Sequence, residues 1–339
     1  MKLKVGLIGL GDHWETRHRP ALLALSDRFD VKAICCEVAE KGQKVARDFN
    51  AVPLDGFRAM INRDDIEAVL VLAPDWVGPL PILAACERGK AVYSSVALDI
   101  APDQVADIRK RVQQSGVAFM AELPRRHAPA TIRLKELMAT RLGQATQLFC
   151  HERMIIEEQT SHLRRGDYCP LTWRSLMELV DWCCYLVGRD PAAVTSTIHQ
   201  PTVNGQASYY QTANLHFADF ESNLSANAQL SVGYYIPRAW QEALSFRRPA
   251  SIQICCENGV AFIDLPSKLI WFDEAGQHTE SLDSDRPVGE QMLVNFYRAV
   301  TRLVRDPVDL ADAYRALQVV TSAHESATTG KQITFDFFD

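Results

Sequence analysis

The first third of the chain alternates continuous apolar runs with segments whose apolar residues recur at helical spacing. The apolar runs predict strands covered on both faces, which is typical of a parallel sheet, and the periodic segments predict helices between them. The predicted strands are Lys4–Leu10, Val31–Cys36, Ala68–Leu72, Ala91–Ser94 and Ala118–Ala121. The predicted helices are Pro20–Ser26, Lys41–Phe49, Gly56–Asn62, Leu80–Arg88 and Pro102–Ser115. Because crossovers between parallel strands are right-handed, these elements predict a doubly wound sheet.

The pattern changes after about residue 122. Residues 192–272 are rich in strands joined by short loops, and apolar and polar residues alternate over Ser222–Val232, which predicts a mostly antiparallel sheet. Helices are predicted on both sides of this region. The remaining predicted elements are a helix at Pro129–Met138, a strand at Ala145–His151, a polar loop at Glu157–Thr172 and helices at Trp173–Val187, Glu290–Val304 and Leu310–Thr329.

The fold class is therefore α/β, with an N-terminal doubly wound parallel sheet and a C-terminal α+β domain that carries a mostly antiparallel open sheet. At 339 residues the chain is too long for one ordinary core. We expect two domains, 1–122 and 123–339. Glycines just past two predicted helices, Gly89 and Gly116, are typical of helix C-terminal caps.

Composition excludes several classes of protein. Apolar residues make up 47% of the chain, and the formal net charge is −6. No basic stripe indicates nucleic-acid binding, and no apolar run reaches the 18 residues of a membrane span. The first residues do not form a secretion signal, so we expect a cytoplasmic protein.

The nine cysteines favour reduced thiols that pack as small apolar side chains. Six of them form adjacent pairs, and neighbours on a strand point to opposite faces, so they rarely bridge. The chain has no C-x-x-C motif, and we expect no metal site made of cysteines.

The first predicted strand runs into a glycine turn, Gly9-Leu10-Gly11, followed by the polar run Asp12–Thr16. This is the layout of a dinucleotide-binding turn, in which one glycine reverses the chain and the next lets the backbone approach a pyrophosphate. The free N–H groups at the start of the next helix would favour the phosphate charge. The third glycine of G-x-G-x-x-G falls on Trp14. A tight turn without any ligand is the alternative.

The chain resembles the glucose–fructose oxidoreductase, inositol dehydrogenase and MocA (Gfo/Idh/MocA) family nearly from end to end. The resemblance rests on the glycine turn and on four longer stretches. These are AVLVLAPDWVGPLPILAACERGKAV from Ala68, PRRHAPATIRLKELM from Pro124, LVDWCCYLVG from Leu179 and the closing segment from Asn295 to Ile333. It implies a Rossmann domain, an NAD or NADP cofactor, a sugar or cyclitol substrate, and dimers or tetramers formed through the open sheet face.

The resemblance also implies which positions bind the cofactor. They are Gly9, Gly11, Asp12, His13, Cys36, Glu37, Ala73, Pro74 and Ser95. Cys36 stands where many members have the acid that holds the adenosine ribose, with Glu37 next in line. Neither offers a guanidinium for a 2′-phosphate, which favours NAD.

The family's catalytic positions have changed in this chain. Val96 matches its catalytic lysine, and Gly78 matches a loop histidine. Its D-x-x-x-H-x-x-D helix matches Arg174, Glu178 and Asp181, so that Glu178 replaces the acid/base histidine. Loss of one charge-stabilising group typically costs about two to three orders of magnitude in rate.

Arg174, Glu178 and Asp181 share one face of their predicted helix. They either line a polar cavity or form a solvated face with an Arg174–Glu178 ion pair. In a cavity, burial would raise the pKa of Glu178 toward that of a useful base, whereas Arg174 would oppose the rise.

Other polar residues are candidates to replace the lost groups. They are Arg125, Arg126, His127, His151, Glu152, Arg153, Asp167, Tyr168 and Trp173. A metal bound by His151, Glu178 and Asp181 is a further alternative. His13 and Trp14 either stack on an adenine or ribose or simply pack in the fold.

Three functions fit the sequence. The first is an active NAD(P)-dependent oxidoreductase with a rearranged site. The second is an inactive family member that binds a nucleotide or sugar-like ligand, as a sensor or as the partner of an active enzyme. The third is an assembly protein with a vestigial nucleotide site.

Overall fold

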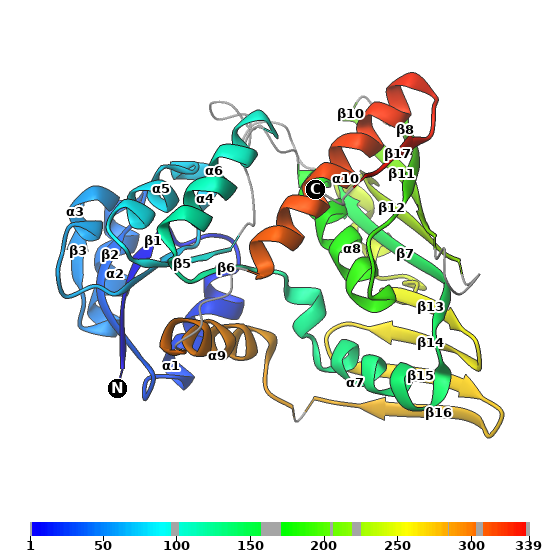
Figure 1. The fold of residues 1–339 in the computed structure, drawn as a ribbon, viewed down its shortest axis with the longest axis horizontal. Helices are drawn as coiled ribbons and strands as arrows, with labels where there is room; N and C mark the ends of the chain where they lie inside the picture. The colour runs from blue at the N-terminus through cyan, green and yellow to red at the C-terminus, as the bar shows by residue number, and fades with distance from the viewer. Residues whose placement is uncertain are drawn as a thin grey trace. The chain divides into compact units, whose positions relative to one another are not determined.

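The computed structural model describes residues 2–95, 102–156, 171–203, 206–218, 225–283, 285–302 and 308–336. The chain forms two compact units (Figure 1). The first contains Met1–Pro124 and Arg286–Arg315, and the second contains Arg125–Asp285 and Ala316–Asp339. The division predicted at residue 122 omits the returning segment Arg286–Arg315. That segment contains helix α9 (Val288–Thr301), whose apolar side chains Met292, Leu293 and Phe296 are buried in the first unit.

The first unit is built on a six-stranded parallel sheet with the strand order β3-β2-β1-β4-β5-β6, which confirms the doubly wound arrangement. The strands are β1 (Leu3–Ile8), β2 (Phe29–Cys35), β3 (Val52–Leu54), β4 (Ala68–Val71), β5 (Ala91–Ser94) and β6 (Phe119–Ala121). The helices are α1 (Arg19–Ala24), α2 (Ala39–Phe49), α3 (Phe57–Ile61), α4 (Pro74–Val77), α5 (Leu80–Glu87) and α6 (Pro102–Ser115).

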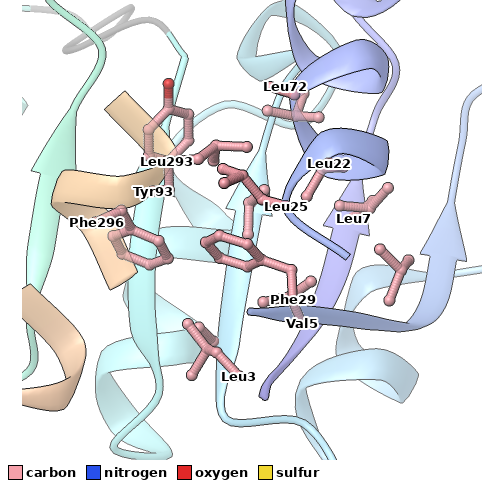
Figure 2. Close-up of a cluster of buried hydrophobic side chains, with 14 of the residues drawn as sticks. Leu3, Val5, Leu7, Leu22, Leu25, Phe29, Leu72, Tyr93, Leu293 and Phe296 are labelled. Carbon is pink, nitrogen blue, oxygen red and sulfur yellow. The ribbon is translucent and has the colours of Figure 1, made fainter. Parts of the chain in front are cut away.

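Buried side chains from the sheet pack with those of α1, α2 and α9 in one apolar cluster (Figure 2). Phe29 and Leu3 lie in this cluster with Tyr93 of β5, whose ring contacts that of Phe296 at 5.6 Å between centroids. The continuous apolar runs are therefore explained by burial of the strands. Gly89 and Gly116 have φ of +65° and +64°, as expected of glycines that follow helices.

Two short elements of this unit were not predicted. Strand β3 has three residues, two of them exposed, so it carries no apolar run. It lies at the edge of the sheet, where Pro53 is tolerated because an edge strand needs fewer backbone donors. Helix α4 has only four residues and follows β4 directly.

The second unit is built on a nine-stranded sheet with the order β16-β15-β14-β13-β7-β12-β11-β8-β17. All its pairs are antiparallel except β12 with β7, so the predicted mostly antiparallel sheet is confirmed. The strands are β7 (Ala145–Ile155), β8 (Ala193–His199), β11 (Tyr209–Phe217), β12 (Ala226–Ile236), β13 (Ile252–Cys256), β14 (Gly259–Asp264), β15 (Lys268–Asp273), β16 (Gly276–Ser281) and β17 (Ile333–Thr334), with β9 (Thr202–Val203) and β10 (Gln206–Ala207) as a separate pair.

Helices cover one face of this sheet, with α8 on β7 and β12 and α7 on β14 and β15. Cys150 of β7 faces α8, since its Sγ lies 3.7 Å from that of Cys183. Its neighbour Phe149 therefore points to the opposite, open face, where its side chain is 40% exposed. The helical elements are η2 (Pro124–His127), α7 (Pro129–Leu137), η3 (Met138–Leu142), α8 (Leu171–Val187), η4 (Arg238–Leu244) and α10 (Val308–Thr329), the last continuing from the first unit.

Within the described part of the chain, no helix is both long and apolar enough to cross a membrane.

Candidate functional site

The two glycines of the turn are required by close packing on the end of β4. Gly9 has φ of +77°, and a Cβ there would lie 2.4 Å from the Cβ of Ala73. A Cβ on Gly11 would lie 2.2 Å from the carbonyl oxygen of Leu72. The glycine pattern therefore has a structural cause within the protein, whether or not a ligand approaches the turn.

The turn nevertheless presents several backbone donors. Among the described residues, no acceptor takes a hydrogen bond from the backbone N–H groups of Gly11, Asp12 and His13. The side chains of Asp12 and His13 are exposed. Partial burial of the ring and the nearby Arg17 lower the pKa of His13. An anion at this turn would thus meet N–H groups and a helix N-terminus.

Trp14 occupies the position of the third glycine, and its side chain packs in the fold. The indole is fully buried and lies against Phe49, with 6.0 Å between ring centroids. The helix begins there with a wide turn, η1 (Trp14–His18), in which the N–H groups of Arg17 and His18 both donate to the carbonyl of His13. Of the two alternatives for Trp14, packing is confirmed. This turn accommodates a large side chain where the motif usually has a glycine.

The end of β2 carries the positions implied for the ribose. Cys36 is half-buried, and its Cβ lies 3.1 Å from where a Cβ on Gly42 would stand, whereas Glu37 is exposed. Sequence reasoning missed Lys41 of α2, whose Nζ donates to the carbonyl of Leu10 at 3.1 Å. A basic residue in the first turn after this strand was the available signal.

The remaining implied cofactor positions lie at the ends of β4 and β5. Ala73 contacts Gly9, and the backbone N–H of Ser95 donates to the carbonyl of Val71 at 2.9 Å. Pro74 begins α4, but its side chain lies outside the described part of the chain, as do Val96, Asp167 and Tyr168.

A buried charge cluster that the sequence did not reveal involves η1, the helical turn that follows the glycine turn. Glu122 follows β6 and is fully buried, and it accepts hydrogen bonds from Arg17 and from His18, the latter at 2.9 Å. Burial alone would raise the pKa of Glu122, but hydrogen bonding and charge from His18 and Arg17 outweigh it and hold that pKa below its usual range. The carboxylate thus joins η1 to the end of β6.

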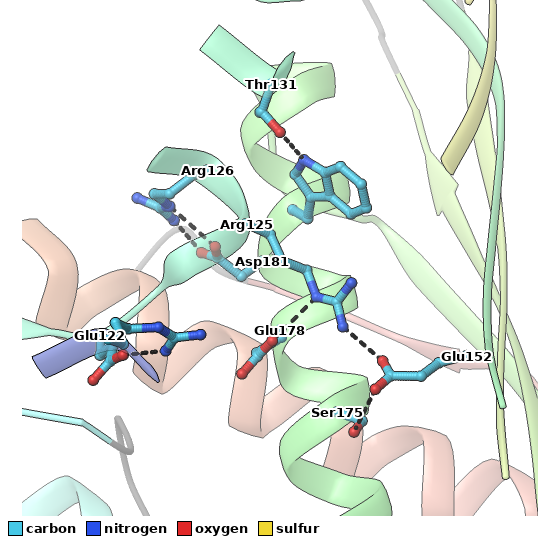
Figure 3. A network of polar contacts seen from close by, with 10 residues as sticks. Glu122, Arg125, Arg126, Thr131, Glu152, Ser175, Glu178 and Asp181 are labelled. Atoms are coloured by element: carbon cyan, nitrogen blue, oxygen red, sulfur yellow. Dashed lines mark hydrogen bonds and ion pairs between the residues drawn. The ribbon is translucent and has the colours of Figure 1, made fainter. Parts of the chain in front are cut away.

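In the second unit, α8 carries the predicted polar stripe, and two tandem arginines of η2 bind it (Figure 3). The Nε of Arg125 donates to Glu178 at 3.1 Å, and the Nε of Arg126 donates to Asp181 at 3.0 Å. The side chain of Asp181 is 2% exposed and that of Glu178 is 37% exposed. The stripe is therefore part of a polar network, in which Arg125 is one partner of Glu178. Arg174 lies half-buried one turn before Glu178.

Glu152 of β7 extends this network. It accepts a hydrogen bond from Arg125 at 2.6 Å and another from the hydroxyl of Ser175 at 3.3 Å. The guanidinium of Arg125 also lies 5.7 Å from the ring of Trp182, whose indole N–H donates to Thr131. Burial would lower the pKa of Arg125, but the charges of Glu178 and Glu152 outweigh it and raise that pKa.

The described contacts of the candidate His151 are with residues other than Glu178 and Asp181. Burial, with help from Arg126, lowers the pKa of His127 to about 4, so this ring is neutral. The Nδ1 of His151 contacts the hydroxyl of Ser231, and its Nε2 accepts from Arg153 at 3.2 Å. Across the described ranges, no three His, Cys, Asp or Glu side chains gather as a metal site.

Comparison with known structures supports the fold. An aldose-aldose oxidoreductase from Caulobacter crescentus matches with a TM-score of 0.82 at 15% identity, over 99% of this chain and 100% of that one. A levoglucosan dehydrogenase complexed with NADH and levoglucosan matches with a TM-score of 0.80 at 16% identity, over 98% and 99% of the two chains. At these identities the likeness concerns the fold alone.

Curated relatives match over shorter stretches. A 2,7-anhydro-N-acetylneuraminate hydratase from Mediterraneibacter gnavus is 24% identical over 217 residues, which are 60% of this chain and 53% of that protein. A dTDP-3,4-didehydro-2,6-dideoxy-alpha-D-glucose 3-reductase from Actinomadura kijaniata is 28% identical over 38% of each chain. This chain thus spans about half, or less, of the length of these relatives.

A family model gives the most direct assignment. Residues 3–122 match the model of the oxidoreductase family with an NAD-binding Rossmann fold, GFO_IDH_MocA. The matched range covers β1 to the end of β6, which includes the glycine turn and Glu122. Over residues 3–122, about a third of its length, the chain is therefore similar to the NAD-binding Rossmann domain of the Gfo/Idh/MocA oxidoreductases.

Proposed function

We propose that this protein is an NAD(P)-dependent oxidoreductase that acts on a sugar or cyclitol-like substrate. The observation that carries the proposal is the set of free backbone donors at Gly11, Asp12 and His13, at the end of β1 in a parallel sheet that matches the family model. The named activities of the relatives and structural neighbours, which concern sugars and sugar derivatives, support the substrate class.

The residues of the turn fit a dinucleotide. The N–H groups of Gly11, Asp12 and His13 would hold the pyrophosphate, and the exposed Glu37 would accept hydrogen bonds from the adenosine ribose. The bound nicotinamide supplies the hydride chemistry. We favour NAD over NADP, because neither Cys36 nor Glu37 offers a cation and the ammonium of Lys41 already donates to Leu10.

The α8 network supplies the polar groups for the substrate in this proposal. Glu178 is partly exposed and would accept a hydrogen bond, and finally the proton, from a substrate hydroxyl. Asp181 is buried against Arg126 and would act by holding the helix and the η2 turn together. Arg174, one turn before Glu178, would bind another polar group of the substrate.

The runner-up is a catalytically inactive family member that binds a nucleotide or sugar-like ligand. Two observations favour it. Val96 replaces the lysine that would stabilise a developing alkoxide, and Glu178 is already engaged by Arg125. We therefore expect turnover that is slow compared with family members that keep the lysine.

The proposal also includes a homodimer or homotetramer formed through the open face of the nine-stranded sheet. Phe149 and Phe272, with 40% and 42% exposure, lie on different strands of this sheet. Large exposed aromatic side chains on one sheet face favour association with another protein surface.

A charge placed in the glycine turn tests the cofactor site. His13→Asp puts a carboxylate next to the proposed pyrophosphate and should weaken NAD binding by tenfold or more. His13→Asn is the matched neutral control, and both changes leave the fold intact because the side chain is exposed.

Binding is measured by calorimetry and by the shift in Tm on adding NAD or NADP, and turnover by cofactor reduction with a panel of sugars and cyclic polyols. Turnover supports the oxidoreductase, whereas saturable binding without turnover selects the inactive binder. Equal NAD affinity in both His13 variants would exclude this turn as the phosphate site.

A further inference from the structure

Arg125 is the residue that ties together the polar groups of α8 and β7. It lies in η2, directly after the strand β6, and its guanidinium binds Glu178 of α8 at 3.1 Å and Glu152 of β7 at 2.6 Å. The ring of Trp182, one helical turn beyond Glu178, lies 5.7 Å from the same guanidinium. Figure 3 shows Arg125 lying between the two carboxylates.

The two arginines of η2 differ in how exposed their carboxylate partners are. Arg126 pairs with Asp181, which has a side chain 2% exposed and thus no oxygen open to a ligand. Arg125 is 15% exposed, but its partners Glu152 and Glu178 are 28% and 37% exposed. A ligand can therefore reach the carboxylates that Arg125 holds, whereas Asp181 is closed.

A guanidinium within hydrogen-bond distance favours the ionised form of a carboxyl group. Its planar fork also fixes the direction of the carboxylate, which a lysine ammonium does less well. One arginine bound to two carboxylates on different elements can act on both in this way.

We propose that Arg125 is a positioning residue of the substrate site, which holds Glu178 ionised and orients Glu178 and Glu152 as two fixed acceptors for substrate hydroxyls. This inference rests on the proposed function, because it assigns the α8 face to the substrate. It implies that Glu178 stays ionised through the neutral pH range and can accept hydrogen bonds throughout it. The substrate group that these two carboxylates would bind is a pair of hydroxyl donors, as in a vicinal diol.

The first test follows the carboxyl groups directly and needs no substrate. Infrared or carbon NMR titration of the whole protein compares wild type, Arg125→Gln and Arg125→Lys, and Glu178→Gln identifies the signal of Glu178. We expect Arg125→Gln to move the titration of Glu178 upward by about one to three pH units. Arg125→Lys should restore most of the shift, because it keeps the charge. An identical Glu178 titration in wild type and Arg125→Gln would overturn the inference.

The matched control is Arg133→Gln, which removes an arginine of α7 paired with Glu280 and Glu136 and should leave the titration of Glu178 unchanged. If Arg125→Gln fails to fold because two carboxylates lose their partner, the double variant Arg125→Gln/Glu152→Gln removes one of those charges. The same upward shift is expected there, and its absence would equally overturn the inference.

The second test uses turnover. In wild type, kcat/KM should not change with pH through the neutral range. In Arg125→Gln, the apparent pKa below which kcat/KM falls should be higher by the same one to three pH units. Arg125→Lys should return this apparent pKa to its wild-type value but keep a raised KM, since lysine orients the carboxylates less well. If no sugar is turned over, the proposed function is contradicted, and the carboxyl titration still decides the role of Arg125.

Discussion

At the scale of single residues, the glycine turn shows how one motif meets two requirements. Gly9 and Gly11 are needed because a Cβ on either would overlap with Ala73 or Leu72 at the end of β4. The same turn also presents the N–H groups of Gly11, Asp12 and His13, which no described acceptor takes. A substitution of Gly11 would therefore disturb the fold before it could report on cofactor binding.

We predict that Gly11→Ala destabilises the protein by about 1–3 kcal/mol, because the new Cβ would lie 2.2 Å from a backbone oxygen and the backbone must shift. Gly56→Ala is the control, since a Cβ at Gly56 meets nothing within 4 Å. Denaturant unfolding of both variants measures the difference. Equal midpoints for the two variants would contradict the close packing of the turn on β4.

At the scale of elements, the ion pairs hold neighbouring segments in each unit. In the first unit, Glu122 joins η1 to the end of β6 through Arg17 and His18. In the second, Arg125 and Arg126 join η2 to α8. The buried pairs matter more than surface pairs because removal of one partner leaves an uncompensated charge away from water.

We predict that Glu122→Gln lowers the free energy of unfolding by about 3–5 kcal/mol at neutral pH. Asp48→Asn is the control, because it breaks the exposed pair with Arg19 and should cost less than about 1 kcal/mol. Thermal or denaturant unfolding across a pH series measures both. A Glu122→Gln loss no larger than that of Asp48→Asn would contradict the role of the cluster.

The stabilisation that Glu122 contributes should also change with pH in a defined direction. The pKa of Glu122 is lower in the folded protein than its usual value, so the ionised carboxylate stabilises the fold above the unfolded-state pKa. This contribution is lost as pH falls through the lower, folded-state pKa. The difference between wild type and Glu122→Gln should therefore shrink in acid.

At the scale of the whole molecule, the two faces of the nine-stranded sheet differ in how much of each is covered by helices. Helices cover one face of the nine-stranded sheet, whereas Phe149 and Phe272 lie exposed on strands whose alternate residues are buried. Phe272 also contacts Phe262, with 6.2 Å between ring centroids. This distribution is the basis for the proposed association through the open face.

We predict that Phe149→Asp shifts the protein toward a monomer in sedimentation velocity, because a charge would replace an aromatic side chain in the interface. Trp240→Ser is the control, since Trp240 is also exposed, at 53%, but lies in η4 outside the sheet. Equal sedimentation of wild type and Phe149→Asp would exclude an interface at this position.

Local patterns in the sequence determined most of the elements. The prediction of Ala91–Ser94 matches β5, because a strand buried on both faces is a continuous apolar run. The prediction of Pro102–Ser115 matches α6, because a helix buried on one side has apolar residues at helical spacing. The doubly wound arrangement of the first sheet also followed, since right-handed crossovers allow few arrangements. The short edge strand β3 lacked such a period.

The tertiary structure decided which distant residues meet, because a period along the chain carries no information on the partner. The sequence indicated that Arg174, Glu178 and Asp181 share a helical face, but the pairing of Glu178 with Arg125 arises from folding of segments 53 residues apart. The burial of Glu122 with Arg17 and His18, and the return of α9 to the first unit, have the same cause. The sequence determined what each segment could form, and packing determined which charges were removed from water together.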